Sequence, residues 1–320
     1  MTTALDNSKV SKHLGQTSEY KDQYDPSLLV REPRSNNREH LDIDDNDLPF
    51  VGYDVWNAYE VSGLTHNGLP ATGVAKIVYP CNSKYIVESK SIKLYFNSFN
   101  MYKCGTTPKR SLEYIAVTAS EDLSKLLGVD VQVHITDGHD DFRRGHSLLA
   151  PSLFPAWRYH NIEASFTDSY LGSMKIDHYT ETPEVLEIDD ISFHEIDESP
   201  GLSKTTAHVH SGLLKSNCRV TSQPDWGDVY IYIKGHNSIN IASLLRYIIS
   251  FRDECHFHEE ICETIYKRLM DVYIPAELCV TCLYARRGGI DINPVRASSE
   301  HLINRDLIDP RMLHTKTLKQ

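Results

Sequence analysis

Residues 214–235 have the sequence LKSNCRVTSQPDWGDVYIYIKG, and this stretch indicates the fold class of the second half of the chain. Its last part, DVYIYIKG at 228–235, alternates Val229, Ile231 and Ile233 with Tyr230, Tyr232 and Lys234. Successive side chains of a strand point to opposite faces, so this period of two predicts a half-buried strand. Pro224 keeps the residue before it extended and Gly227 permits a sharp bend, so the strand should follow a turn.

Apolar spacing and β-branched content predict the other elements. Strands are expected at 55–64, 73–79, 129–135 and 278–284, and helices at 111–127, 241–251 (with Asn240 as N-cap) and 257–273. Both halves therefore combine antiparallel-looking strands with helices, which predicts an α+β protein.

Three parts of the chain are expected from its composition along the sequence. Residues 1–45 are polar with little periodicity and predict an extended arm or a partly ordered leader. Residues 46–190 form a first module that ends in a long, acidic connector with short strands (136–190), and residues 191–320 form a second module. The order of elements is compatible with two related domains in tandem, although no short repeat is visible.

The charge balance limits the classes of partner. The 33 Lys and Arg residues against 44 Asp and Glu residues give a net charge of −11, which argues against direct binding of nucleic acid. No apolar run approaches a membrane span and the first residues lack the apolar core of a signal peptide, so a cytoplasmic protein is expected. Seven cysteines, an odd number, favour reduced thiols over a disulfide framework.

Cys218 and Asp225 lie on either side of the turn in the opening stretch. A thiolate beside a group that can deliver a proton is what covalent catalysis needs. By itself the pair is weak evidence, because a free Cys more often packs as a small hydrophobic residue. His258 and Glu259 are equally compatible with a solvated helix start and with membership of a catalytic or binding site.

Two cationic motifs are also open to two interpretations. Lys90 and Lys93 share one helix face and could hold a phosphate or simply begin a helix, and the same holds for Arg286 and Arg287, followed by two glycines. No standard nucleotide fingerprint is present. Cys279 and Cys282 have C-x-x-C spacing but lack a second ligand pair, so packing is favoured and no metal is expected.

Four motifs taken together resemble one family. They are ESKSIKLYFNSF (88–99), LKSNCRVTSQPDWG (214–227), SFRDECHFHEE (250–260) and ARRGGIDINP (285–294). In this order they resemble the NADPH-dependent 7-cyano-7-deazaguanine reductases, the nitrile reductases of queuosine biosynthesis (a tRNA modification), in their long two-module form. The leader SEYKDQYDPSLLVREPRSNNRE (18–39) is similar as well, and the resemblance is weakest across 101–200.

The resemblance implies a fold and a reaction. The fold would be two tandem tunnelling-fold (T-fold) domains, with antiparallel sheets and helices packed on one face, in a homodimer. Cys218 would attack the nitrile carbon to form a thioimide, Asp225 would protonate the nitrogen, and His258 would handle protons. Two molecules of NADPH would then reduce the thioimide and the resulting imine to the primary amine, on a free base and not on RNA.

The resemblance also implies which residues bind the two ligands. The substrate would contact Glu88, Ser89, His258 and Glu259, and NADPH would contact Ser89, Lys90, Lys93, Arg286 or Arg287, and Gly288. A carboxylate can accept two parallel hydrogen bonds, which suits the ring N–H and exocyclic amine of a guanine-like edge. The sequence departs from the family pattern at Arg219, directly after the Cys, and at Ala285.

Two rival functions remain compatible with the same fold. One is a cyclohydrolase-like enzyme of pterin or purine metabolism, which would need a bound zinc ion. The other is a non-catalytic purine-binding or tRNA-binding protein, which would bind its ligand without a covalent adduct.

Overall fold

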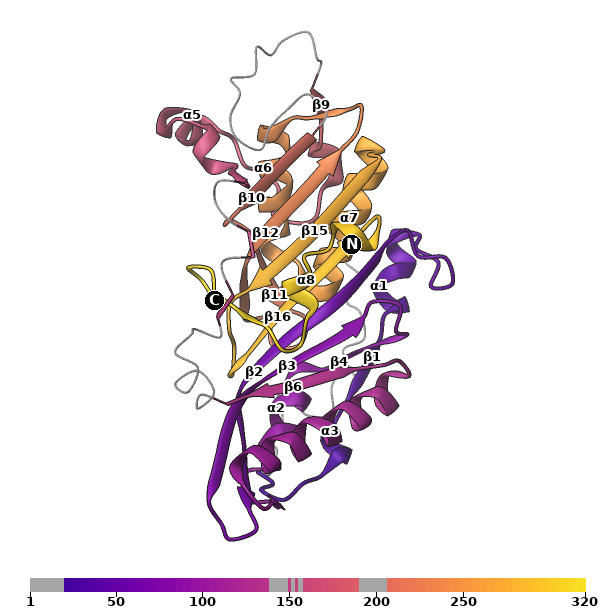
Figure 1. The fold of residues 1–320 in the computed structure, drawn as a ribbon. Coiled ribbons are helices and arrows are strands. Elements are labelled where there is room, and N and C mark those ends of the chain that lie inside the picture. Colours follow the sequence, from indigo (N-terminus) through magenta and orange to yellow (C-terminus); the bar gives the residue numbers. More distant parts are fainter. Residues whose placement is uncertain (1–19, 138–148, 151–152, 155–157, 190–205) are drawn as a thin grey trace.

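The computed structural model describes residues 20–137, 149–150, 153–154, 158–189 and 206–320. Within them, eleven strands form one mixed, mainly antiparallel sheet that runs through both halves of the chain (Figure 1). These strands are β2 Val51–Thr65, β3 Pro70–Pro80, β5 Lys103–Gly105, β6 Gln132–Thr136, β8 His160–Asn161, β10 Thr206–Ser211, β11 Lys215–Cys218, β12 Pro224–Lys234, β14 Cys255–His256, β15 Glu277–Tyr284 and β16 Ile290–Ala297.

The centre of the sheet joins segments that are far apart in sequence. The strand order is β14-β11-β12-β15-β16-β2-β3-β6, with β10 also pairing with β12. At the junction, β16 and β2 pair antiparallel from Ile290 opposite Ala58 to Ala297 opposite Val51. One continuous hydrogen-bonded ladder therefore fixes the second half against the first.

Short pairs of strands lie outside the main sheet. They are β1 Arg31–Pro33 with β4 Tyr85–Val87, β9 Ile188–Asp189 with β13 Ser238–Ile239, and β7 Leu149–Ala150 with β17 Leu313–His314. The α-helices are α1 Ser35–Arg38, α2 Ser89–Asn97, α3 Pro108–Leu127, α5 Asp168–Ser173, α6 Ile241–Ser250, α7 His258–Tyr273 and α8 Arg305–Ile308.

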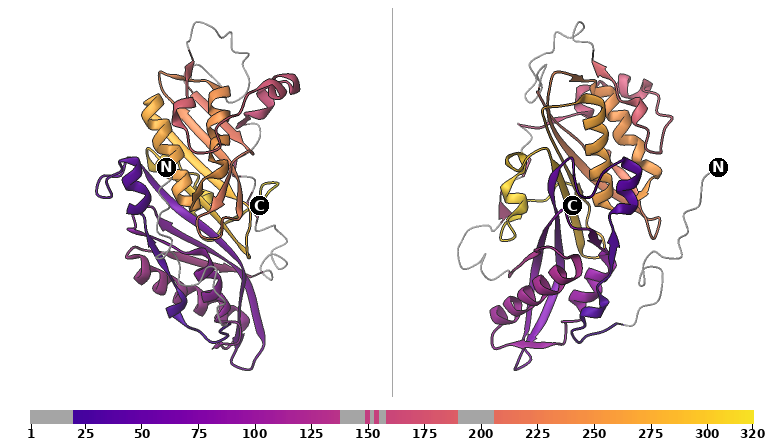
Figure 2. Two further views of the ribbon diagram at one scale, coloured as in Figure 1. Left: turned by 180° about the vertical axis from the view of Figure 1, so that it is seen from behind. Right: turned by 90° about the vertical axis from the view of Figure 1, so that its right-hand side faces the viewer.

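The four longest helices cover one face of the sheet, α2 and α3 over the first half and α6 and α7 over the second (Figure 2). Apolar stripes of α6 and α7 pack on the aliphatic face of β12 and β15, and those of α2 and α3 pack on β2 and β3. A third, smaller cluster lies on the opposite face, where α8 covers the centre of the sheet. Burial of each large aliphatic side chain stabilises such a core by about 1.5–3 kcal/mol.

The predicted strand at 228–235 is confirmed as part of β12, but its polar face is more buried than the alternation suggests. Val229, Ile231 and Ile233 face the core formed by the helices. On the other face Tyr230 is also buried, because the ring of Phe154 stacks on it with 4.2 Å between centroids. The tyrosines of this face therefore pack against a second layer instead of facing solvent.

The predicted helices are confirmed with small shifts of their ends. Helix α6 begins after Asn240, whose side chain accepts a hydrogen bond from the N–H of Ser243 at 2.9 Å, as expected for an N-cap. Cys279 and Cys282 are buried in β15 as free thiols, as expected for packing residues. None of the described helices is both long and apolar enough to cross a membrane.

Two segments differ from their simplest interpretation. The connector predicted at 136–190 falls partly outside the described residues, and its described part contains the short helix α5 besides short strands. In the predicted leader, residues 20–45 include β1 and α1, and Arg34 and Arg38 are buried in ion pairs with Asp54 and Glu263. This part of the leader is thus built into the folded core.

Candidate active site

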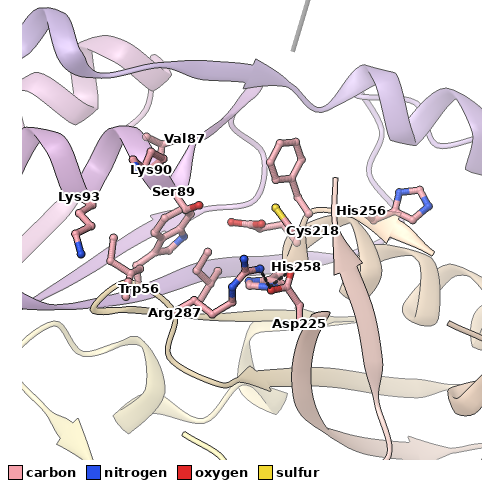
Figure 3. A pocket seen from close by; sticks show the side chains of 15 residues that line it. Trp56, Val87, Ser89, Lys90, Lys93, Cys218, Asp225, His256, His258 and Arg287 are labelled. Carbon is pink, nitrogen blue, oxygen red and sulfur yellow. Dashed lines mark hydrogen bonds and ion pairs between the residues drawn. The ribbon is translucent and has the colours of Figure 1, made fainter. Parts of the chain in front are cut away.

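A cavity of about 250 Å³ opens between the two halves, where helices α2 and α7 both begin (Figure 3). In Figure 3, Cys218, Asp225, His258 and Arg287 lie toward one end and Trp56, Ser89, Lys90 and Lys93 toward the other. The lining residues are Trp56, Val87, Ser89, Lys90, Lys93, Cys218, Asp225, His256, Phe257, His258, Glu259, Arg287, Gly288, Ile290 and Ile292.

Cys218 is the last residue of β11 and is held by the loop that leads into β12. Its N–H donates to the carbonyl oxygen of Gln223 at 2.8 Å, and its carbonyl oxygen accepts from the N–H of Ser222 at 2.9 Å. Ser222 closes this loop with a positive φ of 54°, a conformation that non-glycine residues rarely adopt. The thiol is partly exposed and lines the cavity.

Asp225 is buried beside Arg287 and His258. Its carboxylate accepts a hydrogen bond from Arg287, and its other oxygen lies 3.3 Å from Nε2 of His258, although that pair lacks good hydrogen-bond geometry. Burial raises the pKa of Asp225, but His258 and Arg287 lower it by more, so the pKa lies below its usual value. Asp225 is therefore ionised in the free protein near neutral pH.

Arg287 is aimed at this carboxylate by a tight turn between β15 and β16. Its N–H and carbonyl oxygen both bond with Ile290, and the two residues between them, Gly288 and Gly289, have φ values of 57° and 79°. Positive φ at both positions is the type I′ hairpin turn, which explains the paired glycines. Burial lowers the pKa of Arg287, whereas Asp225 and Cys218 raise it, with a net increase.

Arg286 points elsewhere. Its guanidinium carbon lies 3.3 Å from the centroid of the Tyr59 ring, and the residue does not line the cavity. Of the two neighbouring cations that the sequence left open, the geometry thus brings Arg287 to the cavity.

Glu259 lies in the first turn of α7 and has an unsatisfied oxygen. The side chain is 2% exposed, and its Oε1 has no hydrogen-bond partner within the described part of the chain. Burial and the nearby Asp54 raise the pKa of Glu259 to about 8, against the lowering effect of Arg34. A buried polar atom without a partner is costly, so a ligand in the cavity is the natural source of its hydrogen bonds.

His258 precedes Glu259 and is fixed by stacking. Its ring packs on that of Tyr284 at 3.8 Å between centroids with 15° between the planes. Within the described residues neither ring nitrogen makes a well-formed hydrogen bond, and Nε2 lies 3.3 Å from Asp225, so the ring can serve a ligand or a proton transfer.

Glu88 is the N-cap of α2 and does not line the cavity. Its two oxygens accept from the N–H groups of Lys90 at 2.9 Å and Ser91 at 2.8 Å. Burial raises the pKa of Glu88 more than those bonds lower it. Each oxygen still has acceptor capacity, but in the free protein the carboxylate serves first to orient the start of α2.

Ser89, Lys90 and Lys93 form the cationic end of the cavity. Lys93 pairs with Glu60 at 3.1 Å on the rim, and the side chain of Lys90 has no ion pair among the described residues. The position of these cations at the start of a helix, whose N–H dipoles also favour negative charge, suits phosphate groups.

Six lining residues were not among the predicted site residues: the aliphatic Val87, Ile290 and Ile292, and Trp56, His256 and Phe257. His256 and Phe257 lie within a motif that was recognised, whereas Trp56 was seen only as part of a predicted strand. His256 lies 3.1 Å from Glu254 and 3.3 Å from Glu260, and these carboxylates outweigh the effect of burial and raise its pKa to about 9.

Arg219, where the sequence departs from the family pattern, forms an ion pair with Glu260. Its guanidinium lies 2.6 Å from Glu260, in the first turn of α7. The cation next to Cys218 is thus engaged by a carboxylate and ties the Cys218 loop to the helix that carries His258 and Glu259.

The comparisons with known proteins agree with the motifs. Residues 20–135 match the family model described as nitrile reductase, 7-cyano-7-deazaguanine-reductase N-term, and residues 224–302 match the model described as QueF-like protein. A relative from Chromobacterium violaceum named NADPH-dependent 7-cyano-7-deazaguanine reductase is 37% identical over 90% of this chain and 91% of its own length. The chain belongs to this reductase family.

Further relatives with the same name are equally similar. One from Legionella pneumophila is 38% identical over 89% of each chain, and one from Desulfotalea psychrophila is 37% identical over 91% of this chain and 94% of its own. A solved structure of an archaeosine synthase QueF-Like in the apo form covers 30% of this chain and 95% of its own, with 17% identity and a TM-score of 0.28. The family membership thus rests on relatives that align with nearly the whole length of this chain.

Proposed function

We propose that this reductase reduces the nitrile of 7-cyano-7-deazaguanine to the primary amine with NADPH, through a covalent thioimide on Cys218, in queuosine biosynthesis. The observation that carries the proposal is the arrangement of one cavity. It combines a partly exposed thiol, an ionised carboxylate beside it, and a second, buried carboxylate with an unsatisfied oxygen.

Glu259 is the residue that suits the base. Its carboxylate can accept from both the ring N–H and the exocyclic amine of the deazaguanine, and these bonds would satisfy the oxygen that has no partner in the free protein. His258 and Ser89 line the same cavity and complete the predicted substrate contacts. Glu88 stays a predicted base-binding residue, with its remaining lone pairs available beside the helix cap.

The ionised state of Asp225 suggests how the first proton moves. The thiol of Cys218 adds across the nitrile, its sulfur bonding to carbon while its proton ends on nitrogen. An ionised Asp225 takes the thiol proton and then delivers it to the nitrogen, so it acts as the predicted acid only after acting as a base. Arg287 and His258 stabilise the carboxylate between these transfers.

The cationic residues fit the cofactor. Lys90, Lys93 and Arg287, together with Ser89 and Gly288, surround the cavity with groups that would hold the phosphates of NADPH. NADPH supplies the hydride for each of the two reduction steps when bound. Arg286, stacked on Tyr59, would contribute only to the outer part of such a site.

Three finer features belong to the same proposal. The two halves each carry helices on one face of an antiparallel sheet, which supports tandem T-fold domains. We also propose a homodimer in the cytoplasm, acting on a free base with no direct contact to nucleic acid, in agreement with the net charge of −11. Analytical ultracentrifugation would measure the oligomeric state.

Intact mass measurement tests the central step. Incubation with the nitrile in the absence of NADPH should add the mass of one substrate molecule to the wild type and to Cys255→Ala, which removes another exposed thiol, but not to Cys218→Ala. Cys218→Ala should also lack nitrile-dependent NADPH oxidation. Normal turnover by Cys218→Ala would refute the mechanism.

A further inference from the structure

Trp56 presents a buried hydrogen-bond donor with nothing to bind. The residue lies on β2 at the junction of the two halves, is 1% exposed and lines the cavity. Its indole Nε1 makes no hydrogen bond to any residue that the structure describes. The indole nitrogen can only donate, so an acceptor is missing on the cavity side.

Apolar side chains lie beside Trp56 on both neighbouring strands. Its register partners in the neighbouring strands are Ile292 on β16 and Ile77 on β3, and the cavity wall beside it also includes Val87 and Ile290. Figure 3 places the indole within the cavity lining, between Ser89 and Arg287. A buried donor without a partner is costly, so an acceptor on a ligand in the cavity would complete it.

The cavity limits which ligand this is. Its volume of about 250 Å³ lies below the range of roughly 300–1,000 Å³ that is usual for drug-sized ligands, so it suits a bicyclic base but not a whole dinucleotide. The cationic residues that suit phosphates lie on the more open side, where the side chain of Lys93 is 32% exposed. Trp56 lies toward the same end as these cations in Figure 3, but it and Glu259 are nearly inaccessible, which suits contact with an enclosed base.

The chemistry of the base is complementary to these two residues. Glu259 takes the donors of the heterocycle, its ring N–H and exocyclic amine. The heterocycle also has two acceptors, the ring carbonyl oxygen and the unprotonated nitrogen of the six-membered ring, and both adjoin that donor edge. The nitrile nitrogen is engaged at Cys218 and Asp225, so it does not compete for the indole.

We propose that Trp56 is a substrate-binding residue whose indole N–H donates a hydrogen bond to an acceptor of the six-membered ring. This inference rests on the proposed function, because it takes the deazaguanine as the ligand. Trp56 and Glu259 together would recognise, on the six-membered ring of the ligand, one acceptor next to two donors. That pattern discriminates a guanine-like base from one whose donors and acceptors are exchanged.

The test measures binding without chemistry. In a Cys218→Ala background, which prevents the adduct, Trp56 is changed to Phe or replaced by 3-benzothienylalanine, which keeps the bicyclic shape and has sulfur in place of N–H. The exposed Trp226→Phe is the matched control. The Kd of the nitrile should rise about tenfold in both Trp56 variants and stay unchanged in the control, as for loss of one buried hydrogen bond.

Two analogues of the base separate hydrogen bonding from packing. One has sulfur in place of the carbonyl oxygen, and the other has carbon in place of the unprotonated ring nitrogen. The loss caused by 3-benzothienylalanine should shrink to about twofold or less for one analogue, which identifies the acceptor. An equal loss for all three ligands, or no loss at all, overturns the proposal.

The remaining outcomes are also distinct. If the Trp56 variants weaken NADPH binding and leave nitrile binding unchanged, the indole serves the cofactor and the proposal is wrong. If the Cys218→Ala parent does not bind the nitrile at all, the proposed function itself fails. A thermal melt of each variant gives the folded fraction, on which every Kd is based.

Discussion

Replacing Glu263 by Gln should destabilise the protein strongly, because this carboxylate neutralises a buried group of arginines. Glu263 accepts hydrogen bonds from Arg38 at 2.8 and 2.9 Å and from Arg296 at 2.9 and 3.1 Å, and Arg34 lies 3.6 Å away. All of these side chains are at most 2% exposed. The neutral amide in Glu263→Gln would leave three buried guanidinium groups with Asp54 as their one fully buried carboxylate partner among the described residues.

The magnitude follows from the ionisation of Glu263. Burial raises its pKa, but Arg296, Arg38 and Arg34 lower it by more, from 4.5 to about 2. At about 1.4 kcal/mol per pKa unit, this corresponds to about 3 kcal/mol of stability at neutral pH. Removal of one partner from a buried ion pair typically costs about 3–5 kcal/mol, which agrees.

Urea unfolding of the wild type and Glu263→Gln measures the difference directly. The pKa in the folded state is lower than in the unfolded state, so the stabilisation is fully present above pH 4.5 and is lost as the pH falls toward 2. The difference of about 3 kcal/mol should therefore be constant from pH 6 to 8 and shrink below about pH 4.5.

A matched control is Glu113→Gln, which removes a similar acid from an exposed pair with Arg110 and should change stability by less than about 0.5 kcal/mol. A loss below about 1 kcal/mol in Glu263→Gln, or one that does not shrink in acid, would refute this reasoning.

Three further outcomes are expected. The affinity of Cys218→Ala, which cannot form the adduct, for the nitrile should increase up to about pH 8 and then level off, because Glu259 must lose its proton to accept two N–H groups. Calorimetry in buffers of different ionisation enthalpy should detect proton release, and Glu259→Gln in the same background should abolish it. Asp225→Asn should retain base binding but form the adduct roughly 10²-fold more slowly in stopped-flow measurements, whereas an unchanged rate would make Asp225 a structural residue. Lys93→Ala should raise the KM for NADPH several-fold without affecting the KM for the nitrile, and the exposed Lys125→Ala should change neither; an equal change in both KM values would exclude a specific phosphate contact.

Local patterns predicted the elements that have a clear apolar period or a standard helix cap. The alternation in β12 and the N-cap at Asn240 identified a strand and a helix correctly. Strand β16 was missed because all eight of its residues are buried, including Asp291, Asn293 and Arg296, so no alternation marks it. Its pairing with β2, more than 230 residues earlier in the chain, has no local signal.

In the site, too, local sequence predicted the residue types but not their positions in space. The motifs identified residue types that suit the reaction, but Arg286 and Arg287 share one local sequence, and only the type I′ turn determines which of them meets Asp225. Glu88 is a predicted substrate contact because its motif resembles that of the family, and the structure shows that it also caps α2, although Glu is not a preferred N-cap. Trp56 carried no local signal, since its role depends on a donor left without a partner by the folded chain.

The two carboxylates that line the cavity are buried to a similar extent but have opposite ionisation in the free protein. Asp225 is ionised because Arg287 and His258 offset its burial, whereas Glu259 is largely protonated at neutral pH because burial and Asp54 prevail. Carboxylates whose environments drive their pKa values apart are suited to different tasks. Under the proposed function, the ionised Asp225 lies toward the Cys218 end of the cavity, where it would take up the thiol proton, and Glu259 would lose its own proton when the base offers it two donors. On this proposal the second negative charge would form together with the bound base, since two charged, buried carboxylates in one small cavity would oppose folding.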